Sequence, residues 1–512
     1  MRSRAVLGVL IGLLTAAVAV GVGEAVAAFV RPAAAPVIAV GNRIILLTPE
    51  SAKRSAINSF GTNDKSVLIV CIYVLLGVFG ALLGQLALRR LSYGLFGVAV
   101  FAAFGAYCAL TANASRATDV IPTLVGAAVA AATLVLLVRE IRHEDERGAA
   151  AGPAFTDRRG FLAGSAAVAG LAALAGFGGR AAQRTRFDVT AARKKIVLPK
   201  PSSPVPVEPP GTDLGKSGVP WRTPNQNFYR VDTALSVPQL RPDDWSLRVH
   251  GMVDREIRLS YAELRRRPLI ERWITLCCVS NEVGGPLIGN ARWLGARLAD
   301  VLDEAGLHTD SDQLILSSSD GMTIGAPTKV VMDGRDAMIA IGMNGAPLPV
   351  EHGFPARIVV PGLYGYVSAC KWVVDIEATT FDARRAYWVQ GGWAQQTGIK
   401  LQSRIDTPRS GKRVTVGRPA AIAGVAWDQH VGVSAVEVQV NDGAWQRARL
   451  ASVPSTDTWR QWVLPWTPPS PGSYVLRVRA VDARGNPQIE QRADVFPSGA
   501  TGLHTVTVHA SN

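Results

Sequence analysis

The first 180 residues are nearly continuous apolar runs that short polar stretches interrupt. A helix needs about 20 predominantly apolar residues to cross the ~30 Å hydrocarbon core of a bilayer. Four runs reach this length, and a fifth is shorter and rich in Gly and Ala. The expected membrane segments are residues 5–30, 66–88, 91–112, 120–141 and 161–178. The pattern therefore predicts an N-terminal α-helical transmembrane bundle over 1–180 with about five spans.

Hydrophobic patterning changes character after residue 180. A proline-dense stretch over 181–224, typical of a semi-rigid extended linker, comes first. The region after it mixes β-type runs at 315–318, 357–360 and 372–376 with helical patterns at 261–267 and 298–304. The C-terminal residues hold strand-like runs, which include 436–440, 462–466 and 474–481. We therefore expect an α+β domain over 225–404 and an all-β, Ig-like sandwich over 405–512.

Composition agrees with a membrane-embedded part and narrows the choice of partners. Charged residues make up 18% of the chain, against about 25% in ordinary soluble proteins. The formal net charge of +14 would suit nucleic acid, an anionic membrane surface or a phosphorylated ligand. No helix-turn-helix, zinc finger or aromatic-interleaved basic run is present, so we expect no nucleic-acid partner. The five cysteines form no spaced framework, which excludes a disulfide-stapled secreted module.

Basic residues predict the orientation of the bundle, because Lys and Arg collect on the cytoplasmic side of membrane helices. The arginines at the ends of the expected spans are Arg2, Arg4, Arg89, Arg90, Arg139, Arg142 and Arg147. All of them lie inside if the N-terminus is cytoplasmic, although the basic residues within 31–65 mildly oppose this assignment. Five spans then place the C-terminal domains outside the cytoplasm.

Glu24 is the one ionisable residue within the first four expected spans. An acid inside a membrane span suggests function by default. Because Glu24 lies near the outer end of its span, we expect its carboxylate to snorkel to the interface instead.

The fifth span follows a sequence with a second meaning. Residues 157–162 read Asp-Arg-Arg-Gly-Phe-Leu and resemble a twin-arginine export signal, here internal rather than N-terminal. Two positive-inside arginines before an ordinary span are the simpler alternative. The export interpretation implies a domain that folds before it crosses the membrane. No convincing Ala-x-Ala cleavage site follows, so we expect the segment to remain as an anchor.

The densest candidate for chemistry is the segment 273–285, Trp-Ile-Thr-Leu-Cys-Cys-Val-Ser-Asn-Glu-Val-Gly-Gly. Cys277 and Cys278 follow an apolar run and precede a polar turn that contains glycine. These residues alone allow a soft metal ligand, a redox dithiol or a buried pair of small hydrophobes. Zinc is disfavoured because no second Cys pair exists and the His residues are scattered singly.

A second polar group is expected on loops between 343 and 372. Asn344 and Gly345 predict a turn, and His352 precedes Arg357 at the start of a predicted strand. Together with Lys371, these side chains could clamp an anionic cofactor through charge-assisted hydrogen bonds.

The two groups in combination resemble the molybdopterin-binding domain of the sulfite oxidase family. The resemblance rests on Thr-Leu-Cys-Cys-Val-Ser-Asn at 275–281 and Asn-Gly-Ala-Pro-Leu-Pro-Val-Glu-His-Gly-Phe-Pro-Ala-Arg at 344–357. It covers about 225–400, and the β-domain after it looks like the family's C-terminal dimerisation domain, which implies a possible homodimer. The resemblance implies oxygen-atom transfer at a mononuclear centre, with molybdenum-molybdopterin as the cofactor.

The resemblance also assigns roles to single residues. It implies that Cys278, three positions before Asn281, ligates molybdenum, and that Cys277 is packed away. It implies that Arg230 reaches the metal site. The residues expected to contact the cofactor are Asn227, Tyr229, Arg230, Asp320, His352, Arg357, Ser368 and Lys371.

One departure from the family pattern bears on the substrate. Family members that oxidise sulfite carry arginines after the cysteine, whereas Glu282 stands here. A lost charge-assisted contact weakens anion binding by about 1.5–3 kcal/mol. We therefore expect a small S-oxide or N-oxide as oxygen donor or acceptor. Sulfite dehydrogenase activity is the alternative, in which Arg230 and Arg404 would partly compensate.

The electron partner is expected to be separate from the chain. No Cys-x-x-Cys-His sequence occurs, and no His lies within an expected span, so the sequence predicts no haem of its own. A separate electron-transfer protein or a membrane quinone remains, beside the lipid bilayer itself. The expected location is the cell membrane, multi-pass, with the catalytic domain extracytoplasmic. A cofactor-free, membrane-tethered binding or scaffold protein is the alternative from another class.

Overall fold

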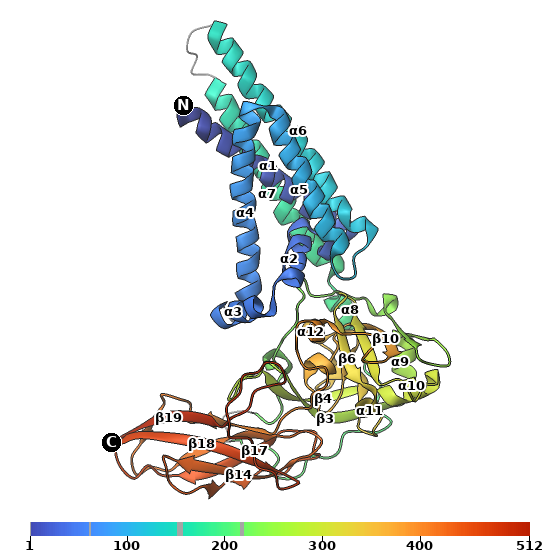
Figure 1. Cartoon of the computed structure of the whole chain (residues 1–512), viewed down its shortest axis with the longest axis vertical. Helices are drawn as coiled ribbons and strands as arrows, with labels where there is room; N and C mark the ends of the chain where they lie inside the picture. Colours follow the sequence, from blue (N-terminus) through green and yellow to red (C-terminus); the bar gives the residue numbers. More distant parts are fainter. Residues whose placement is uncertain (1, 61–62, 151–156, 216–219) are drawn as a thin grey trace. The chain divides into compact units, whose positions relative to one another are not determined.

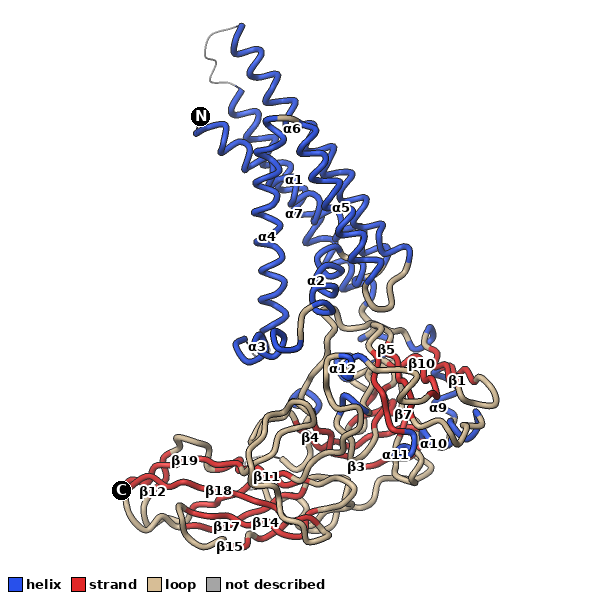
Figure 2. The backbone as a smooth tube through the Cα atoms, in the orientation of Figure 1, coloured by secondary structure: helices blue, strands red, loops and turns tan. Residues whose placement is uncertain are grey.

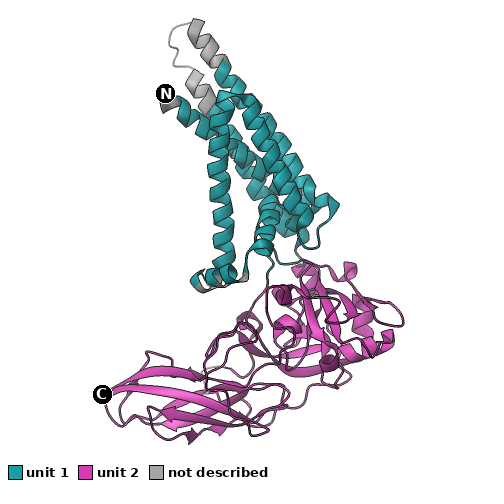
Figure 3. Cartoon of the chain, viewed as in Figure 1, with its two compact units in different colours: residues 1–188, 233–239 teal, residues 189–232, 240–512 magenta. Residues whose placement is uncertain are grey.

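A computed structural model describes the chain except for residues 1, 61–62, 151–156 and 216–219 (Figure 1). Within its helices, the side chains of residues 2–3, 50, 54, 57–58, 143–150 and 157–162 are also outside the description, and the twin-arginine pair is among them. The chain forms two compact units, residues 1–188 with 233–239 and residues 189–232 with 240–512 (Figure 3).

The first unit is built from helices throughout its described part (Figure 2). Its α-helices are α1 (Arg2–Val30), α2 (Pro36–Leu47), α3 (Glu50–Phe60), α4 (Asp64–Arg89), α5 (Leu91–Thr111), α6 (Ile121–Ala150) and α7 (Asp157–Phe187), with 3₁₀ turns η1 (Pro32–Ala34) and η3 (Ala117–Val120). Five segments are long and apolar enough to cross a membrane, which confirms the expected spans: Arg4–Val30, Asp64–Arg89, Leu91–Thr111, Ala117–Arg142 and Ala163–Lys194. Helix α2 is apolar but too short to span, so its pattern gave no membrane signal.

Helix α1 packs against α4, α6 and α7 through small residues. A side-chain carbon at Gly12 would lie 1.8 Å from the carbonyl oxygen of Gly80 in α4, and one at Gly84 would lie 1.9 Å from the carbonyl oxygen of Gly8. Gly126 of α6 approaches Ala19 of α1 in the same way. Glycine therefore allows these backbones to approach closely, as is common between membrane helices.

The expectation that Glu24 snorkels is wrong, because α7 supplies partners for its carboxylate inside the bundle. Glu24 is 2% exposed. Its Oε1 lies 3.2 Å from Nη2 of Arg180, and its Oε2 accepts a hydrogen bond of 3.1 Å from Gln183. Arg180 also donates to the hydroxyl of Tyr73 in α4. The buried acid thus joins α1 to α7 and, through Arg180, to α4.

The second unit begins with α8 (Thr190–Lys194) and an extended segment. Ser203 of this segment pairs with Ile270, and its hydroxyl accepts a hydrogen bond of 2.9 Å from Arg272. The proline-rich residues therefore lie partly along the edge of a sheet.

Two sheets form the domain that carries the predicted chemistry. One has the order β2-β1-β10-β5-β6, with only β1 and β10 parallel. Its strands are β1 (Ser246–Gly251), β2 (Ile257–Ser260), β5 (Gln313–Ser318), β6 (Thr323–Pro327) and β10 (Val373–Thr379). The other has the order β3-β4-β7-β8, with β9 beside β7. Its strands are β3 (Leu269–Cys277), β4 (Ile288–Arg297), β7 (Met338–Met343), β8 (Ala346–Pro347) and β9 (Arg357–Val359).

Short helices close the domain, and their ends follow local sequence rules. They are α9 (Tyr261–Arg266), α10 (Leu298–Ala305), α11 (Thr328–Val331) and α12 (Tyr387–Gln390), with 3₁₀ turns η4 (Asn225–Asn227), η5 (Pro242–Asp244), η6 (Val350–His352) and η7 (Gly365–Val367). Ser260 and Glu263 form a capping box at the start of α9, and Gly306 ends α10 at a φ of 71°.

The C-terminal residues form two sheets, as the Ig-like prediction requires. Their orders are β11-β13-β17-β16 and β12-β19-β18-β14-β15. The strands are β11 (Gln402–Thr407), β12 (Arg413–Thr415), β13 (Ala420–Trp427), β14 (Val433–Val440), β15 (Gln446–Arg447), β16 (Arg449–Leu450), β17 (Arg460–Trp466), β18 (Gly472–Asp482) and β19 (His504–Ser511).

This β-domain shares a core with the domain before it. Trp427 and Trp459 belong to the same buried cluster as Trp221 and Trp273. The indole N–H of Trp459 donates to the carbonyl of Trp221 at 2.8 Å, and its backbone N–H donates to Thr275 Oγ1 at 2.8 Å. The two domains are therefore one packed body at this junction.

Candidate active site

The loop between β3 and β4 carries the two neighbouring thiols. Cys277 ends β3, the chain turns over 278–287, and β4 begins at Ile288. The backbone N–H of Cys278 donates to Leu287 O at 3.0 Å, and Asn281 Oδ1 accepts from the N–H of Leu287 at 2.8 Å. Asn281 thus closes the loop, which explains structurally why an amide side chain stands three positions after the cysteine.

The two thiols differ in environment. Cys277 belongs to the hydrophobic core, and burial raises its pKa well above the ordinary value. Burial also raises the pKa of Cys278, but the backbone and hydroxyl of Ser280 and the ammonium of Lys371 oppose this effect. Only Cys278 therefore has polar and cationic neighbours that stabilise a thiolate.

Arg357, the first residue of β9, is buried with 5% exposure. Its guanidinium donates to the carbonyls of His352 at 3.2 Å and Ala369 at 3.4 Å and lies over the Trp293 ring, 5.1 Å from its centroid. No ion pair between described residues involves Arg357. Burial lowers its pKa to about 10, with Tyr229 and Cys370 opposing. A buried cation without a carboxylate partner is suited to receiving an anion.

Lys371 and Arg230 share one carboxylate. Lys371 Nζ lies 3.0 Å from Oδ2 of Asp232, and Arg230 Nε lies 2.7 Å from the same oxygen. The side chains of Asp232 and Lys371 are 5% and 12% exposed, whereas that of Arg230 is 41% exposed. Burial lowers the pKa of Lys371 to about 8, Asp232 opposes this shift, and Arg357 and Arg230 add to it.

His352 is positioned by the loop before Arg230. Its Nε2 lies 3.2 Å from the carbonyl of Asn225, and its ring meets that of Phe228 edge-to-face at 5.6 Å. Burial, reinforced by Arg357 and Lys371, lowers the pKa of His352 to about 4. The imidazole is therefore neutral at pH 7 and donates from Nε2.

Tyr229 lies in the same electrostatic environment as the thiols. Burial raises the pKa of its phenol well above 10, Cys278 and Cys277 raise it further, and Arg357 opposes them. The structure therefore brings together Tyr229, Cys278 and Arg357, which lie far apart in the sequence.

Three predicted contact residues are less integrated. Asn227 ends the 3₁₀ turn η4 and is exposed. Asp320 accepts a hydrogen bond of 3.2 Å from the N–H of Met322 in the β5–β6 turn, and its charge raises the pKa of Cys370. Ser368 is fully buried, and its hydroxyl donates to the carbonyl of Tyr364 at 3.0 Å. That donor is already satisfied by the backbone.

The sequence did not reveal the residues that hold these loops together. Asp232 has no motif of its own, although its place two residues after Arg230 was a signal. Asn344, expected only as a turn residue, has a φ of 52° and donates from Nδ2 to Thr223 O at 3.0 Å and to Asn225 Oδ1 at 2.7 Å. The turn between β7 and β8 therefore fixes the loop that presents Tyr229 and Arg230.

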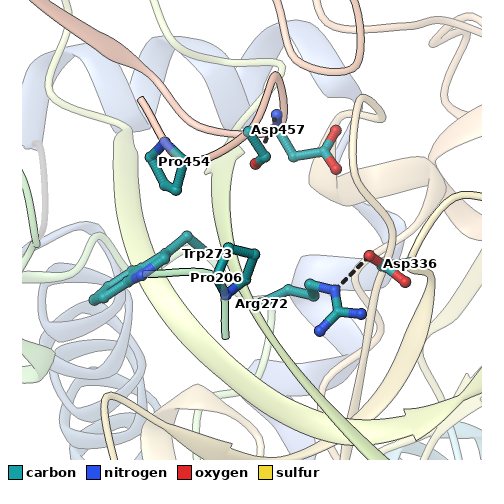
Figure 4. A pocket seen from close by; sticks show the side chains of 7 residues that line it. Pro206, Arg272, Trp273, Asp336, Pro454 and Asp457 are labelled. Carbon is teal, nitrogen blue, oxygen red and sulfur yellow. Dashed lines mark hydrogen bonds and ion pairs between the residues drawn. The ribbon is translucent and has the colours of Figure 1, made fainter. Parts of the chain in front are cut away.

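A separate pocket with an empty volume of about 360 Å³ lies where β3 meets the β-domain (Figure 4). Its lining residues are Pro206, Arg272, Trp273, Asp336, Pro454, Ser455 and Asp457. None of the predicted site residues lines it. Arg272 and Asp336 are paired with each other at 2.6 Å, so the pocket offers no free cation to an anionic ligand.

The chemistry of the site suits a cofactor that brings most of its own metal ligands. No group of three or more His, Cys, Asp or Glu side chains within the described ranges could hold a metal ion alone. One thiol with cationic neighbours, Cys278, lies among buried donors. This set fits a molybdenum whose other ligands come from a pterin dithiolene, with Arg357 and Lys371 facing the cofactor's anionic groups.

Comparisons with known proteins agree with this division of the chain. Residues 234–388 match the family model described as the oxidoreductase molybdopterin binding domain, and residues 402–508 match the bacterial Ig domain. Human mitochondrial sulfite oxidase is 32% identical over 342 residues, with 57% of this chain and 61% of that protein covered. Sulfite oxidase of Gallus gallus is 30% identical over 344 residues, with 57% and 73% covered.

A solved structure is also similar. The crystal structure of the sulfane dehydrogenase SoxCD from Paracoccus pantotrophus gives a TM-score of 0.47 at 24% identity and covers 56% of this chain and 80% of that one. The chain spans less than two thirds of the human relative's length.

Proposed function

Because the chain belongs to the sulfite oxidase family, we propose that it is a membrane-anchored, molybdopterin-dependent oxidoreductase that transfers an oxygen atom to or from a small S-oxide or N-oxide. The observation that carries this proposal is the buried Arg357 guanidinium, which has no carboxylate partner among the described residues and lies near Tyr229 and Cys278. The cofactor, when bound, supplies the two-electron redox chemistry of oxygen transfer.

The chain's own residues bind and orient the cofactor. Cys278 provides the thiolate ligand to molybdenum, and Lys371 lowers its pKa. Arg357 and Lys371 bind the anionic groups of the pterin, and neutral His352 donates a hydrogen bond without adding charge. Tyr229 and Arg230 border the metal side of the site. Asn227, Asp320 and Ser368 complete the proposed contacts, and Asn227 and Ser368 have the weaker structural support.

The substrate preference follows from which cations are free. Arg230 is bound to Asp232, and Arg404 is bound to Asp406 at 2.6 Å, so neither is available to a dianion as the sequence suggested. Glu282 is exposed in the cysteine loop. These features favour a neutral oxide. Sulfite oxidation is the second candidate, because the relatives with curated names are sulfite oxidases.

The decisive test is the molybdenum and pterin content of purified full-length protein from a host that synthesises the cofactor. We expect about one molybdenum per chain in the wild type and loss of the metal or of activity in Cys278→Ser. Cys277→Ala is the matched control, because its thiol packs in the core, and it should retain metal. Wild-type protein without molybdenum would contradict the proposal and favour a cofactor-free scaffold.

Substrate and location need separate measurements. Turnover of S-oxides and N-oxides with an artificial electron donor, compared with sulfite oxidation in the same preparation, separates the two candidates. A separate redox protein or a quinone is the proposed electron partner. The proposed orientation, with the enzyme domain extracytoplasmic, rests on the arginines at the span ends.

A further inference from the structure

The β-domain reaches the loop that carries Cys278. Arg404 of β11 is 8% exposed and donates from Nη1 to the carbonyl of Gly285 at 2.7 Å. Its Nε lies 2.6 Å from Asp406 Oδ1, so the carboxylate holds the guanidinium in place. Arg404 also opposes the rise in the pKa of Cys277, which places its charge beside the thiols.

A second residue of the β-domain contacts the same loop. A side-chain carbon at Gly284 would lie 2.2 Å from Cδ2 of His504, so the imidazole packs directly on this glycine, whose φ is 79°. The Nδ1 of His504 accepts a hydrogen bond of 3.0 Å from the N–H of Ile405. Burial and the neighbouring Arg404 lower the pKa of His504 to about 4, so its ring is neutral and does not repel the guanidinium at pH 7.

The loop has little other support between these contacts and the cysteine. Gly285 donates to the carbonyl of Glu282 at 2.8 Å, and a side-chain carbon on it would lie 2.7 Å from Asn281 Oδ1. Asn281 in turn bonds the backbones of Cys278 and Leu287. A displacement of Gly285 therefore passes through Asn281 to Cys278.

We infer that Arg404 of the β-domain is a positioning residue for Cys278, holding the cysteine loop through the carbonyl of Gly285. The β-domain is then part of the active site in addition to any role in dimerisation. This inference rests on the proposed function only for its catalytic meaning, because the position of the loop can be measured without cofactor.

The test uses cofactor-free, full-length protein in a Cys277→Ala background. The rate of Cys278 alkylation by iodoacetamide, resolved by peptide mass spectrometry, is followed from about pH 7 to pH 10 so that accessibility is separated from thiol pKa. In Arg404→Met, we expect the high-pH plateau rate to rise by about tenfold, because the buried loop opens. Arg404→Lys keeps a donor and should restore most of the protection.

The matched control is Arg409→Met. Arg409 is exposed and acts on the pKa of Asp406 but makes no printed contact with the loop, so its removal should leave the rate within about twofold. In cofactor-loaded protein, Arg404→Met should also alter the Mo(V) electron paramagnetic resonance spectrum, whereas Arg409→Met should not.

If Arg404→Met does not fold, His504→Ala provides the second variant, because it removes the contact on Gly284 and leaves the Arg404–Asp406 pair intact. An unchanged plateau rate in a folded Arg404 variant would overturn the inference. Faster alkylation together with no molybdenum in the wild type would uphold the positioning role and reject the proposed enzyme.

Discussion

Buried cations define the candidate site at the scale of single residues. Arg357 is held by backbone carbonyls and an aromatic face, and Lys371 is held by Asp232. Leaving charge buried is unfavourable unless an anion compensates it. The two residues therefore have a clear purpose in a protein that binds an anionic cofactor, and each leads to a distinct expectation.

Replacing Arg357 by Met should abolish retention of the cofactor. A charge-assisted contact contributes about 1.5–3 kcal/mol, so affinity should fall roughly tenfold to a hundredfold, and less in Arg357→Lys. Molybdenum per chain after gel filtration is the measurement. Arg335→Met is the control, since Arg335 pairs with Asp333 at 2.6 Å. Full molybdenum content in a folded Arg357→Met protein would remove this residue from the site.

Lys371 should make anion binding depend on pH. Its pKa of about 8 means that the ammonium loses its proton as pH rises through 8, and binding of an anion favours the protonated form. The affinity of cofactor-free protein for inorganic pyrophosphate should be constant below pH 8 and fall by up to about tenfold per pH unit above it. Isothermal titration calorimetry measures this. Lys371→Arg should remain flat over the same range, and a flat wild-type profile would contradict the assignment.

At the scale of elements, close packing of backbones determines the bundle and the site alike. Helix α1 meets α4 through glycines, and the cysteine loop meets His504 through Gly284. Glu24 and Arg180 add a buried ion pair between α1 and α7. In each case, the residue that matters is the one that permits or occupies a close approach.

A larger residue at Gly12 should separate α1 from α4. In Gly12→Val, the added carbons would collide with the backbone of Gly80, and overpacking of this kind destabilises by about 1–3 kcal/mol. Gly170→Ala in α7 is the control, because nothing lies within 4 Å of its new carbon. Unfolding of the bundle in detergent, followed by circular dichroism, should show a lower midpoint only for Gly12→Val. Equal midpoints would exclude tight packing of α1 on α4.

At the scale of the whole molecule, the chain combines a membrane bundle with a two-domain body that shares one core. A domain that needs a preassembled cofactor benefits from folding before it crosses the membrane. The Arg158-Arg159 pair offers a signal for such a route. This proposal and the orientation of the bundle can be tested together.

Changing Arg158 and Arg159 to lysine keeps both charges and removes the twin-arginine pattern. If the signal operates, protease-accessible enzyme domain on bacterial spheroplasts should fall by about tenfold, while positive-inside topology alone predicts no change. Immunoblotting before and after protease treatment gives the result. Arg142→Lys is the control outside the motif. Wild-type domain that stays protected from protease would contradict the extracytoplasmic orientation.

The sequence by itself determined the spans, the order of domains, many strands and the nature of the central thiol. Hydrophobic length, strand alternation and turn residues are local properties, so the helices from α4 to α7 and strands such as β14 and β17 could be predicted from them. The family pattern around 275–281 and 344–357 likewise indicated Cys278, His352 and Arg357.

Only the tertiary structure decided which side chains become partners. Asp232 meets Lys371, Arg404 meets Gly285, and Glu24 meets Arg180 across long separations in the chain. No local pattern encodes such pairings, because they depend on how sheets and helices bring distant backbones together. For the same reason, Glu24 was expected at the membrane surface and Arg404 near a substrate anion, whereas folding supplies both with partners inside the protein.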